Sequence, residues 1–409
     1  MTALPLDGIR IFDMSRIMAG PFCTQYLADL GADVIKVERP DAGDDTRAWG
    51  PVYLKDAEGN DTTESAYYLS ANRNKRSIAI NVSSPEGQAL AKKLIAKSDI
   101  LVQNFKVGGL KKYGLDYDTL SKEFPRLVYC SISGFGQTGP YANRPGYDFM
   151  AQGFGGLMSV TGEPGGMPMK AGVAVADVMC GMYSAIAILA ALRHRDNTGE
   201  GQHIDCALGD TQIAWMVNQA SNYLISGESP GLMGNSHPSI VPYTVFEASD
   251  GYIILAVGND NQFRKWCEHA GANELWEDDR FKTNKGRLEH RQLLTDLMTP
   301  YMKSRTIQQW IEGLETVGVP VGPVNNMERA FNDPHTKARN MVVNLPHPLA
   351  GGDGTVPLVA NPVKMSKTPP QHRRAPPVLG QHTDEVLEDW LGLDATAIAD
   401  LAEKGATTV

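Results

Sequence analysis

Residues 9–38 read IRIFDMSRIMAGPFCTQYLADLGADVIKVE. Within them, the apolar run Ile9–Phe12 is typical of a strand, and Thr24–Leu30 has helical spacing that ends at Gly31. Asp33–Glu38 is a second strand-like run, which stops before Pro40. Two short strands separated by a helix predict a parallel pair joined by a right-handed crossover. The stretch therefore predicts an open α/β fold.

The same alternation continues through the first half of the chain. Further strands are expected at Ser77–Val82, Ile100–Val102, Leu127–Ile132 and His203–Cys206, and helices at Glu86–Lys97, Val175–Leu192 and Thr211–Ile225. Pro85 stands before the second helix, where a first turn tolerates it. The pattern predicts a Rossmann-like open parallel sheet in a large domain.

A run rich in glycine and proline, Gly227–Pro238, predicts a loop or a joint between domains. Strands at Tyr243–Ala248 and Tyr252–Val257, followed by helices rich in tryptophan and charge, predict a smaller α+β domain. We therefore expect a large domain over residues 1–225, a small one over 226–330, and a C-terminal segment over 331–409 whose last helix has Thr383 as its N-cap.

Composition excludes several classes of function. The 409 residues hold 38 basic and 47 acidic side chains, so the net charge of −9 argues against broad binding to nucleic acid but allows a small anionic ligand. The longest purely apolar run, Ala185–Leu192, is far shorter than the ~20 residues of a membrane span. No secretory signal is expected at the N-terminus.

The cysteines also limit the chemistry. The five, Cys23, Cys130, Cys180, Cys206 and Cys267, are widely spaced and form no Cys-x-x-Cys pair. Neither a disulfide framework nor a metal site is expected. We predict a protein of a reducing compartment, the cytoplasm, with no membrane partner.

Ser15–Pro21, which follows the first strand, has no Gly-x-Gly-x-x-Gly pattern, so a nicotinamide site is disfavoured. Asp177 is more informative, because it stands among small apolar residues at the start of the Val175–Leu192 helix. Such an aspartate is often only an N-cap. It is equally placed to act as a nucleophile, because a helix N-terminus favours the ionised carboxylate and small neighbours admit a substrate. The residue pattern leaves both roles open.

Several segments resemble, in chain order, motifs of the class III CoA-transferases, the CaiB/BaiF or formyl-CoA transferase family. They are RIMAGPF (16–22), GADVIKVERP (31–40), NKRS (74–77), NF (104–105), GFGQTGP (134–140), TGEGQ (198–202) and PPVLGQHT (376–383). At the position of Asp177 this family carries its nucleophile. The resemblance implies that the Asp177 carboxylate attacks an acyl-CoA and passes through a covalent aspartyl intermediate.

The resemblance also implies contacts to coenzyme A. They fall on Met18, Ala19, Arg39, Ile80, Asn81, Val82, Ser83, Asn104, Phe105, Lys106, Lys112, Arg144 and Tyr147. The basic members of this set are able to neutralise phosphates. Formyl-CoA transferases carry glutamine where Met18 stands, which puts formyl or oxalyl transfer in doubt, since a thioether lacks an amide donor.

Two alternatives share the fold. Related α-methylacyl-CoA racemases place a histidine before the aspartate where this chain has Tyr147–Asp148, and a phenol with a pKa of about 10 is a poor base near neutral pH. Asp148 could orient a substrate or serve as a cap. The second alternative is a non-catalytic acyl-CoA-binding protein.

The motifs GDDTRAWG (43–50), SANRNK (70–75) and HPSIVPY (237–243) resemble the succinyl-CoA-dependent dicarboxylate subgroup. Transfer of CoA from succinyl-CoA to a small dicarboxylic acid such as glutarate or itaconate is therefore expected, with no metal or nicotinamide. Arg47 and Arg73 could grip the far carboxylate, or could hold their own loops. The loop with Gly234 and His237 is expected to shield the reacting group. The resemblance further implies an interlocked homodimer whose C-terminal segment returns to the large domain.

Overall fold

The computed structural model describes residues 3–408; residues 1–2 and 409, at the ends of the predicted first and last segments, lie outside it. The chain forms two compact units. The first contains the residues up to Leu157, then Lys170–Glu228 and the residues from His335 on, and the second contains Met158–Met169 and Ser229–Pro334. The short segment Met158–Met169 therefore belongs to the second unit, although the sequence pattern placed it in the large domain.

A six-stranded, entirely parallel sheet forms the centre of the first unit, as expected from the strand–helix–strand repeat. Its spatial order is β5-β2-β1-β6-β7-β8. The order runs one way from β1 to β5 and the other way from β6 to β8, so it reverses between β1 and β6. The strands are β1 (Arg10–Asp13), β2 (Asp33–Glu38), β5 (Lys75–Ala79), β6 (Ile100–Gln103), β7 (Val128–Ser133) and β8 (His203–Ala207).

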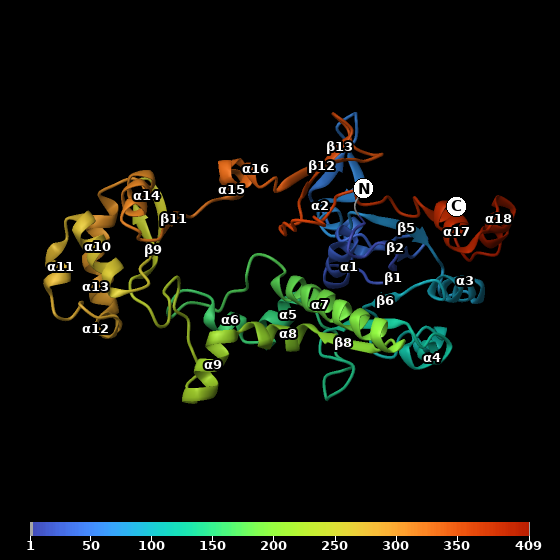
Figure 1. The fold of residues 1–409 in the computed structure, drawn as a ribbon, viewed down its shortest axis with the longest axis horizontal. Helices are drawn as coiled ribbons and strands as arrows, with labels where there is room; N and C mark the ends of the chain where they lie inside the picture. Colours follow the sequence, from blue (N-terminus) through green and yellow to red (C-terminus); the bar gives the residue numbers. More distant parts are fainter. Residues whose placement is uncertain (1–2, 409) are drawn as a thin grey trace. The chain divides into compact units, whose positions relative to one another are not determined.

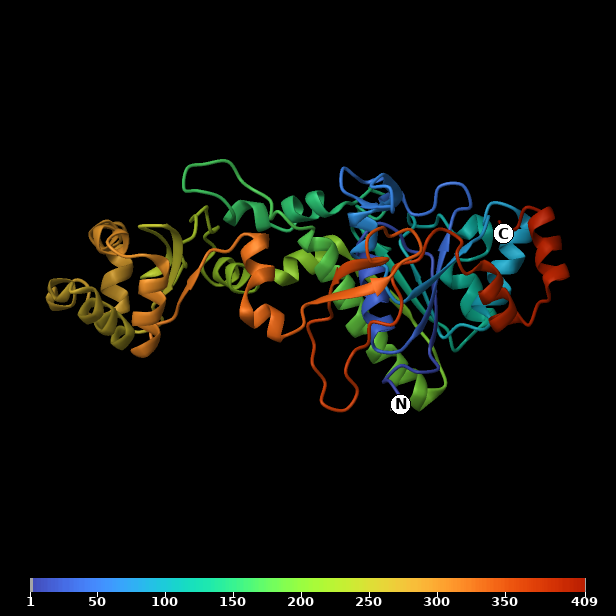
Figure 2. The same cartoon turned by 90° about the horizontal axis from the view of Figure 1, so that it is seen from above.

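Apolar residues alternate between the two faces of the sheet. Ile11 and Val34 belong to one buried cluster, whereas their neighbours Phe12 and Ile35 belong to another. Helices α1 (Ala19–Asp29) and α7 (Val175–Thr198) contribute to the first cluster and run beside each other (Figure 1, Figure 2). Helices α3 (Pro85–Ile95), α4 (Tyr117–Glu123), α17 (Thr383–Leu391) and α18 (Ala395–Glu403) contribute to the second.

Helix α7 is long and apolar enough to cross a membrane by length and composition. Half of its apolar window is buried, and the helix packs on α1, β7 and β8. It is therefore a core helix of the first unit. The expected helix Thr211–Ile225 is instead two helices, α8 (Leu208–Trp215) and α9 (Val217–Ser226), because Val217 leaves the helical region with a φ of 35°.

The last part of the chain packs on the edge strand β5. In Figure 1, α17 lies beside β5. His382 N–H donates to the Ser77 carbonyl, and Thr407 forms an antiparallel bridge with Ile80. The predicted N-cap of α17 is displaced by one residue: His382 is the N-cap and Thr383 is the first helical residue. Before it, β12 (Val342–Pro346) and β13 (Thr355–Val359) form a hairpin.

The remaining elements of the first unit surround the sheet. They are the 3-10 turns η1 (Asp45–Ala48) and η2 (Lys111–Tyr113), the hairpin β3 (Tyr53–Lys55) and β4 (Asp61–Ser65), and helices α2 (Ala66–Leu69) and α5 (Asp148–Phe154). Two short helices, α6 (Leu157–Val160) and α16 (Pro334–Ala338), stand where the chain passes between units.

The second unit is α+β. Its antiparallel sheet has the order β11-β10-β9, and its core includes Trp266 and Trp310, neither of which is exposed. The strands are β9 (Tyr243–Ala248), β10 (Gly251–Ala256) and β11 (Val321–Pro323). The helices are α10 (Asp260–Ala270), α11 (Asn273–Glu277), α12 (Asn284–Glu289), α13 (Arg291–Lys303), α14 (Ile307–Thr316) and α15 (Met327–Asn332).

A buried ion pair joins β1 to the edge strand β5, with β2 between them in the main sheet. Asp13, at the end of β1, lies 3.1 Å from Lys75 Nζ at the start of β5, and neither side chain is exposed. Thr24 Oγ1 donates to the same carboxylate, and Lys75 also donates to the Pro21 carbonyl. Both charges are therefore fully partnered inside the protein.

Asp13→Ala should lower the free energy of unfolding by about 3–5 kcal/mol, because it leaves the Lys75 ammonium buried without its counter-charge. Urea denaturation measures this loss. The control is Asp61→Ala, which removes an exposed pair with Lys55 and should cost at most about 1 kcal/mol. An equal loss of unfolding free energy in the two variants would contradict the conclusion that Asp13 and Lys75 form a buried pair.

Candidate functional site

The reversal of strand order between β1 and β6 places a crevice at the carboxyl ends of these strands. The loops that follow them are tied together across this crevice. Arg16 N–H donates to Asn104 Oδ1 at 3.0 Å, and Asn104 Nδ2 donates to the Arg16 carbonyl at 2.7 Å. A ligand site is expected here because neighbouring strands lead their loops in opposite directions.

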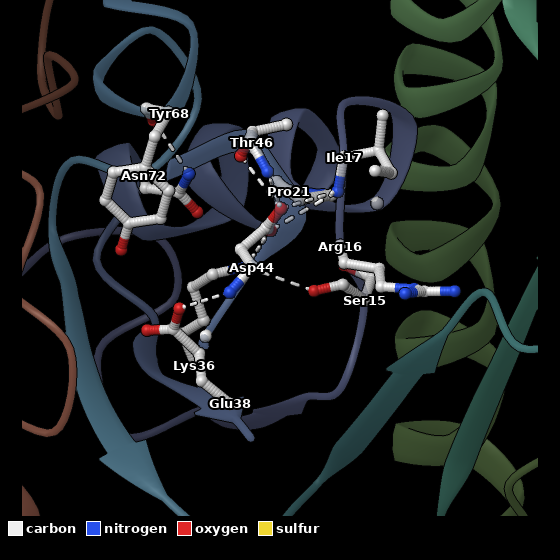
Figure 3. A network of polar contacts seen from close by, with 12 residues as sticks. Ser15, Arg16, Ile17, Pro21, Lys36, Glu38, Asp44, Thr46, Tyr68 and Asn72 are labelled. Atoms are coloured by element: carbon white, nitrogen blue, oxygen red, sulfur yellow. Dashed lines mark hydrogen bonds and ion pairs between the residues drawn. The ribbon is translucent and has the colours of Figure 1, made fainter. Parts of the chain in front are cut away.

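The loop after β1 is held by the buried carboxylate of Asp44, the hub of the network in Figure 3. Asp44 accepts hydrogen bonds from the Ile17 and Thr46 amides and from Lys36 Nζ, the last at 2.7 Å. Ile17 has a φ of 73°, a left-handed conformation that is costly for a β-branched residue. These contacts compensate for that cost and fix the loop at the edge of the crevice.

Asp177 is the third residue of α7 and is only 8% exposed. It opens on a cavity of about 530 Å³. The wall of this cavity includes residues from both tied loops, and predicted coenzyme contacts from several elements: Met18, Ala19, Asn104, Phe105, Lys106, Arg144 and Tyr147. The structure thus brings together the predicted nucleophile and seven of the predicted contacts.

The pKa of Asp177 is raised to about 7, first by burial and then by the negative charge of Asp148. The expectation that the N-terminus of α7 keeps this carboxylate ionised is therefore wrong. Desolvation and a like charge outweigh the helix dipole at this position. Near neutral pH this carboxyl group is therefore partly protonated.

A second cavity, of about 570 Å³, adjoins the first, since Arg16 and Phe105 stand in the walls of both. The predicted contacts Arg39, Ile80, Asn81, Val82 and Ser83 line it. The exposed Arg39 guanidinium pairs with Asp45 at 3.0 Å. A long ligand could therefore reach from Arg39 to Asp177 within the first unit.

The comparisons with known proteins agree with this geometry. The sequence profile described as CoA-transferase family III matches residues 6–383. The chain belongs to CoA-transferase family III. A succinate–glutarate CoA-transferase from Agrobacterium fabrum is 49% identical, with 96% of this chain and 97% of that protein covered. A succinyl-CoA:glutarate CoA-transferase from Homo sapiens is 41% identical, with 98% of this chain and 89% of that protein covered.

Among solved structures, a CaiB/BaiF family protein from Brucella suis is 46% identical and superposes with a TM-score of 0.85, over 95% of this chain and all of that one. The chain is thus a CoA-transferase, with a CoA thioester and a carboxylic acid as its substrates. Among residues 3–408, no group of three or more His, Cys, Asp or Glu side chains is arranged to hold a metal ion.

Arg47 and Arg73 do not face either cavity of the transferase. The Arg47 guanidinium is buried against Glu38, Glu64, the Tyr68 hydroxyl and the Pro377 carbonyl. Arg73 forms a bidentate pair with Asp29 and also donates to the Val359 carbonyl. Each is only 6% exposed and already paired, so in this structure neither is free to grip a substrate carboxylate, and both take the structural role that the sequence left open by joining neighbouring elements of the first unit.

Three other predicted residues stand apart from the cavity walls. Lys112 lies over the ring of Tyr113, which lines the second cavity. Gly234 and His237 belong to the second unit, where the Gly234 N–H donates to the Gly162 carbonyl and the His237 ring lies 5.1 Å from that of Tyr243. Their role in shielding the reacting group stays a prediction.

The sequence pattern missed the C-terminal residues that line the second cavity of the transferase. Gly405, Thr407 and Thr408 form part of its wall, and Thr407 Oγ1 donates to the Ala79 carbonyl at 2.5 Å. They stand beyond the part of the chain that the family profile matches. No local signal points to them, because only tertiary packing brings them beside Ile80.

Asp177→Asn should stabilise the transferase above neutral pH. Since the folded-state pKa exceeds the ordinary value, the folded chain binds more protons than the unfolded chain between about pH 4 and 7. Stability from this group is therefore lost as the pH rises through that window, and an amide avoids the loss. We expect a gain of about 2–4 kcal/mol at pH 8 and of only about 1 kcal/mol at pH 4.5, measured by urea denaturation.

Asp196→Asn is the matched control, because this side chain lies exposed at the far end of the same helix. It should leave stability unchanged at both pH values. A gain for Asp177→Asn that is independent of pH would contradict the raised pKa.

Proposed function

We propose that this CoA-transferase moves CoA from succinyl-CoA to glutarate or a similarly small dicarboxylic acid such as itaconate, through covalent attachment to Asp177. The observation that carries the proposal is the buried Asp177 carboxylate in the wall of a cavity lined by predicted coenzyme contacts. The names of the two relatives above support the choice of donor and acceptor.

The exchange takes place in two matched halves. An Asp177 carboxylate oxygen attacks the thioester carbon, and the C–S bond breaks to give an aspartyl anhydride and CoA thiolate. The thiolate then attacks the Asp177 carbonyl carbon, which releases the donor acid and leaves an aspartyl-CoA thioester. The acceptor carboxylate repeats these steps in reverse, so one thioester replaces another without ATP.

The two cavities fit this chemistry. The nucleotide end of CoA would lie beside Arg39 and residues Ile80–Ser83, and the pantetheine arm would pass Arg16 and Phe105 toward Asp177. Burial of Asp177 supports the proposal in a second way, because an anhydride survives only where water has little access.

A racemase-like reaction is not favoured. Tyr147 stands in the cavity wall at the position where a catalytic histidine would be required, and it is 60% exposed. A phenol is a weaker general base than an imidazole near neutral pH and removes an α-proton inefficiently. The relatives named above are transferases, which also disfavours a purely binding role.

Asp177→Ala should abolish transfer of CoA from succinyl-CoA to glutarate, with a loss of at least about 10³-fold in kcat, while CoA still binds. In the wild type, kcat/KM should fall tenfold per pH unit below about pH 7, because only the ionised carboxylate attacks. Mass spectrometry of thioester products across a panel of acids measures both activity and acceptor choice.

Asp196→Ala, at the other end of α7, is the control and should retain wild-type turnover. Wild-type thioester exchange by Asp177→Ala would refute the aspartyl route. Hydroxylamine trapping of a modified peptide containing residue 177 should succeed in the wild type and fail in the variant.

We further propose that two chains form the interlocked homodimer of the family, in the cytoplasm. The first unit exposes a set of large apolar side chains on α5, α7, α8 and α9. They are Phe149, Met150, Phe154, Tyr183, Ile186, Ile213, Trp215, Val217, Tyr223, Leu224 and Ile225. A second copy would remove them from water. All five cysteines are buried and free, which supports a reducing compartment.

Light scattering should give the wild type about twice its 44.4 kDa chain mass. Replacing Leu224 and Ile225, which are 79% and 88% exposed, with glutamate should reduce the dimer fraction, since it would bury two charges in the interface. A monomeric wild type at micromolar concentration would contradict the proposal.

A further inference from the structure

The start of α7 is capped by a side chain from another helix. Asp148, at the start of α5, accepts a hydrogen bond from the Ala176 amide at 2.8 Å and a longer one from the Asp177 amide at 3.3 Å. Ala174, the N-cap residue of α7 itself, provides no side-chain acceptor. The first amides of a helix have no partner inside it, so the Asp148 carboxylate takes a role that α7 cannot fill alone.

Gln152 strengthens this arrangement from one turn further along α5. Its Nε2 donates to the second oxygen of Asp148 at 2.6 Å, and its Oε1 accepts from the Ala171 amide at 2.8 Å. The Gln152 side chain is completely buried. Together, Asp148 and Gln152 hold both ends of the segment 171–177 that leads into the nucleophile.

Asp148 also places a negative charge beside Asp177. Other ionisable groups lie near the nucleophile, because Arg16, Asp45, Lys106, Arg144 and Tyr147 line the same cavity. On α2, burial first and then the charges of Asp177 and Asp148 raise the pKa of Tyr67. Among these charges, it is that of Asp148 which, with burial, raises the pKa of Asp177. The same residue thus fixes the backbone of the nucleophile and opposes its ionisation.

We propose that Asp148 is a positioning residue of the transfer, which anchors the first turn of α7 and repels the carboxylate charge of Asp177 until acylation removes that charge. The inference rests on the proposed aspartyl route. When the Asp177 oxygen bonds to the acyl carbon, its charge leaves with the CoA sulfur. Both the anhydride and the aspartyl thioester are uncharged at residue 177. The repulsion is therefore present in the free enzyme and absent in the covalent intermediates, which favours their formation.

Asp148→Asn removes the charge while its amide oxygen still accepts from the Ala176 amide; its NH2 group no longer accepts from Gln152 Nε2, a loss that Gln152→Leu reproduces without changing the charge. The acid limb of kcat/KM should move to lower pH by about one unit, since the like charge is gone. At pH 8, kcat should fall about tenfold with KM for succinyl-CoA changed less than twofold, because the repulsion no longer drives acylation. Asp148→Glu keeps the charge and should keep the wild-type limb.

Gln152→Leu tests the anchoring of residues 171–177 separately from the charge of Asp148. It leaves the Asp148 carboxylate in place but releases residues 171–173, so kcat should fall while the acid limb stays where it is in the wild type. If Asp148→Asn does not fold, Asp148→Ser provides a second neutral residue that can cap a helix. A wild-type acid limb in a folded neutral variant, or unchanged kcat in Gln152→Leu, would overturn the inference.

The two proposals fail in different ways. If Asp177→Ala is inactive but neutral variants of Asp148 show the wild-type pH profile, the aspartyl route stands and the role of Asp148 is wrong. If Asp177→Ala retains transfer, the aspartyl route itself is wrong, whatever Asp148 does.

Discussion

A carboxylate removed from water, with a second carboxylate close to it, is the constraint on which the site depends. Taking Asp177 out of solvent makes its charge costly, and the charge of Asp148 adds to that cost. In the proposed reaction, the same burial would restrict the access of water to the acyl group. The protein tolerates this arrangement because α7 is anchored at its start by α5 and is packed along its length on α1 and the sheet.

Several charged side chains of the N-terminal motifs hold the loops around this site in place. Lys36, Lys75 and Arg47 all lie buried in ion pairs with carboxylates on or beside the first strands. Such pairs contribute little net stability compared with apolar packing, but removing one partner strongly destabilises the protein, because the other charge stays buried without a partner. Their effect is to hold the loops at the point where the strand order reverses, including the strained backbone at Ile17.

Local pattern predicted the elements of the fold well, because strands and helices of an open α/β sheet have distinct periodicities. The errors have local causes. Helix α1 begins at Ala19 and not at Thr24, since Pro21 fits within a first turn. Asp177 and all the predicted contacts to coenzyme A except Lys112 lie in the walls of two neighbouring cavities. The motifs left two roles open for Arg47 and Arg73, because a sequence motif does not reveal which carboxylates are already nearby; the structure has both arginines in buried pairs.

By itself, the sequence determined the parallel sheet and the family, because these follow from periodicity and from motifs at fixed positions, and the family resemblance pointed to Asp177 as the proposed nucleophile. Only the tertiary structure decided the state of that residue. The direction of its pKa shift depends on burial and on Asp148, and the role of Asp148 depends on which helix it reaches. Desolvation and charge repulsion act through space, between groups brought together by folding, so no local pattern along the chain encodes them.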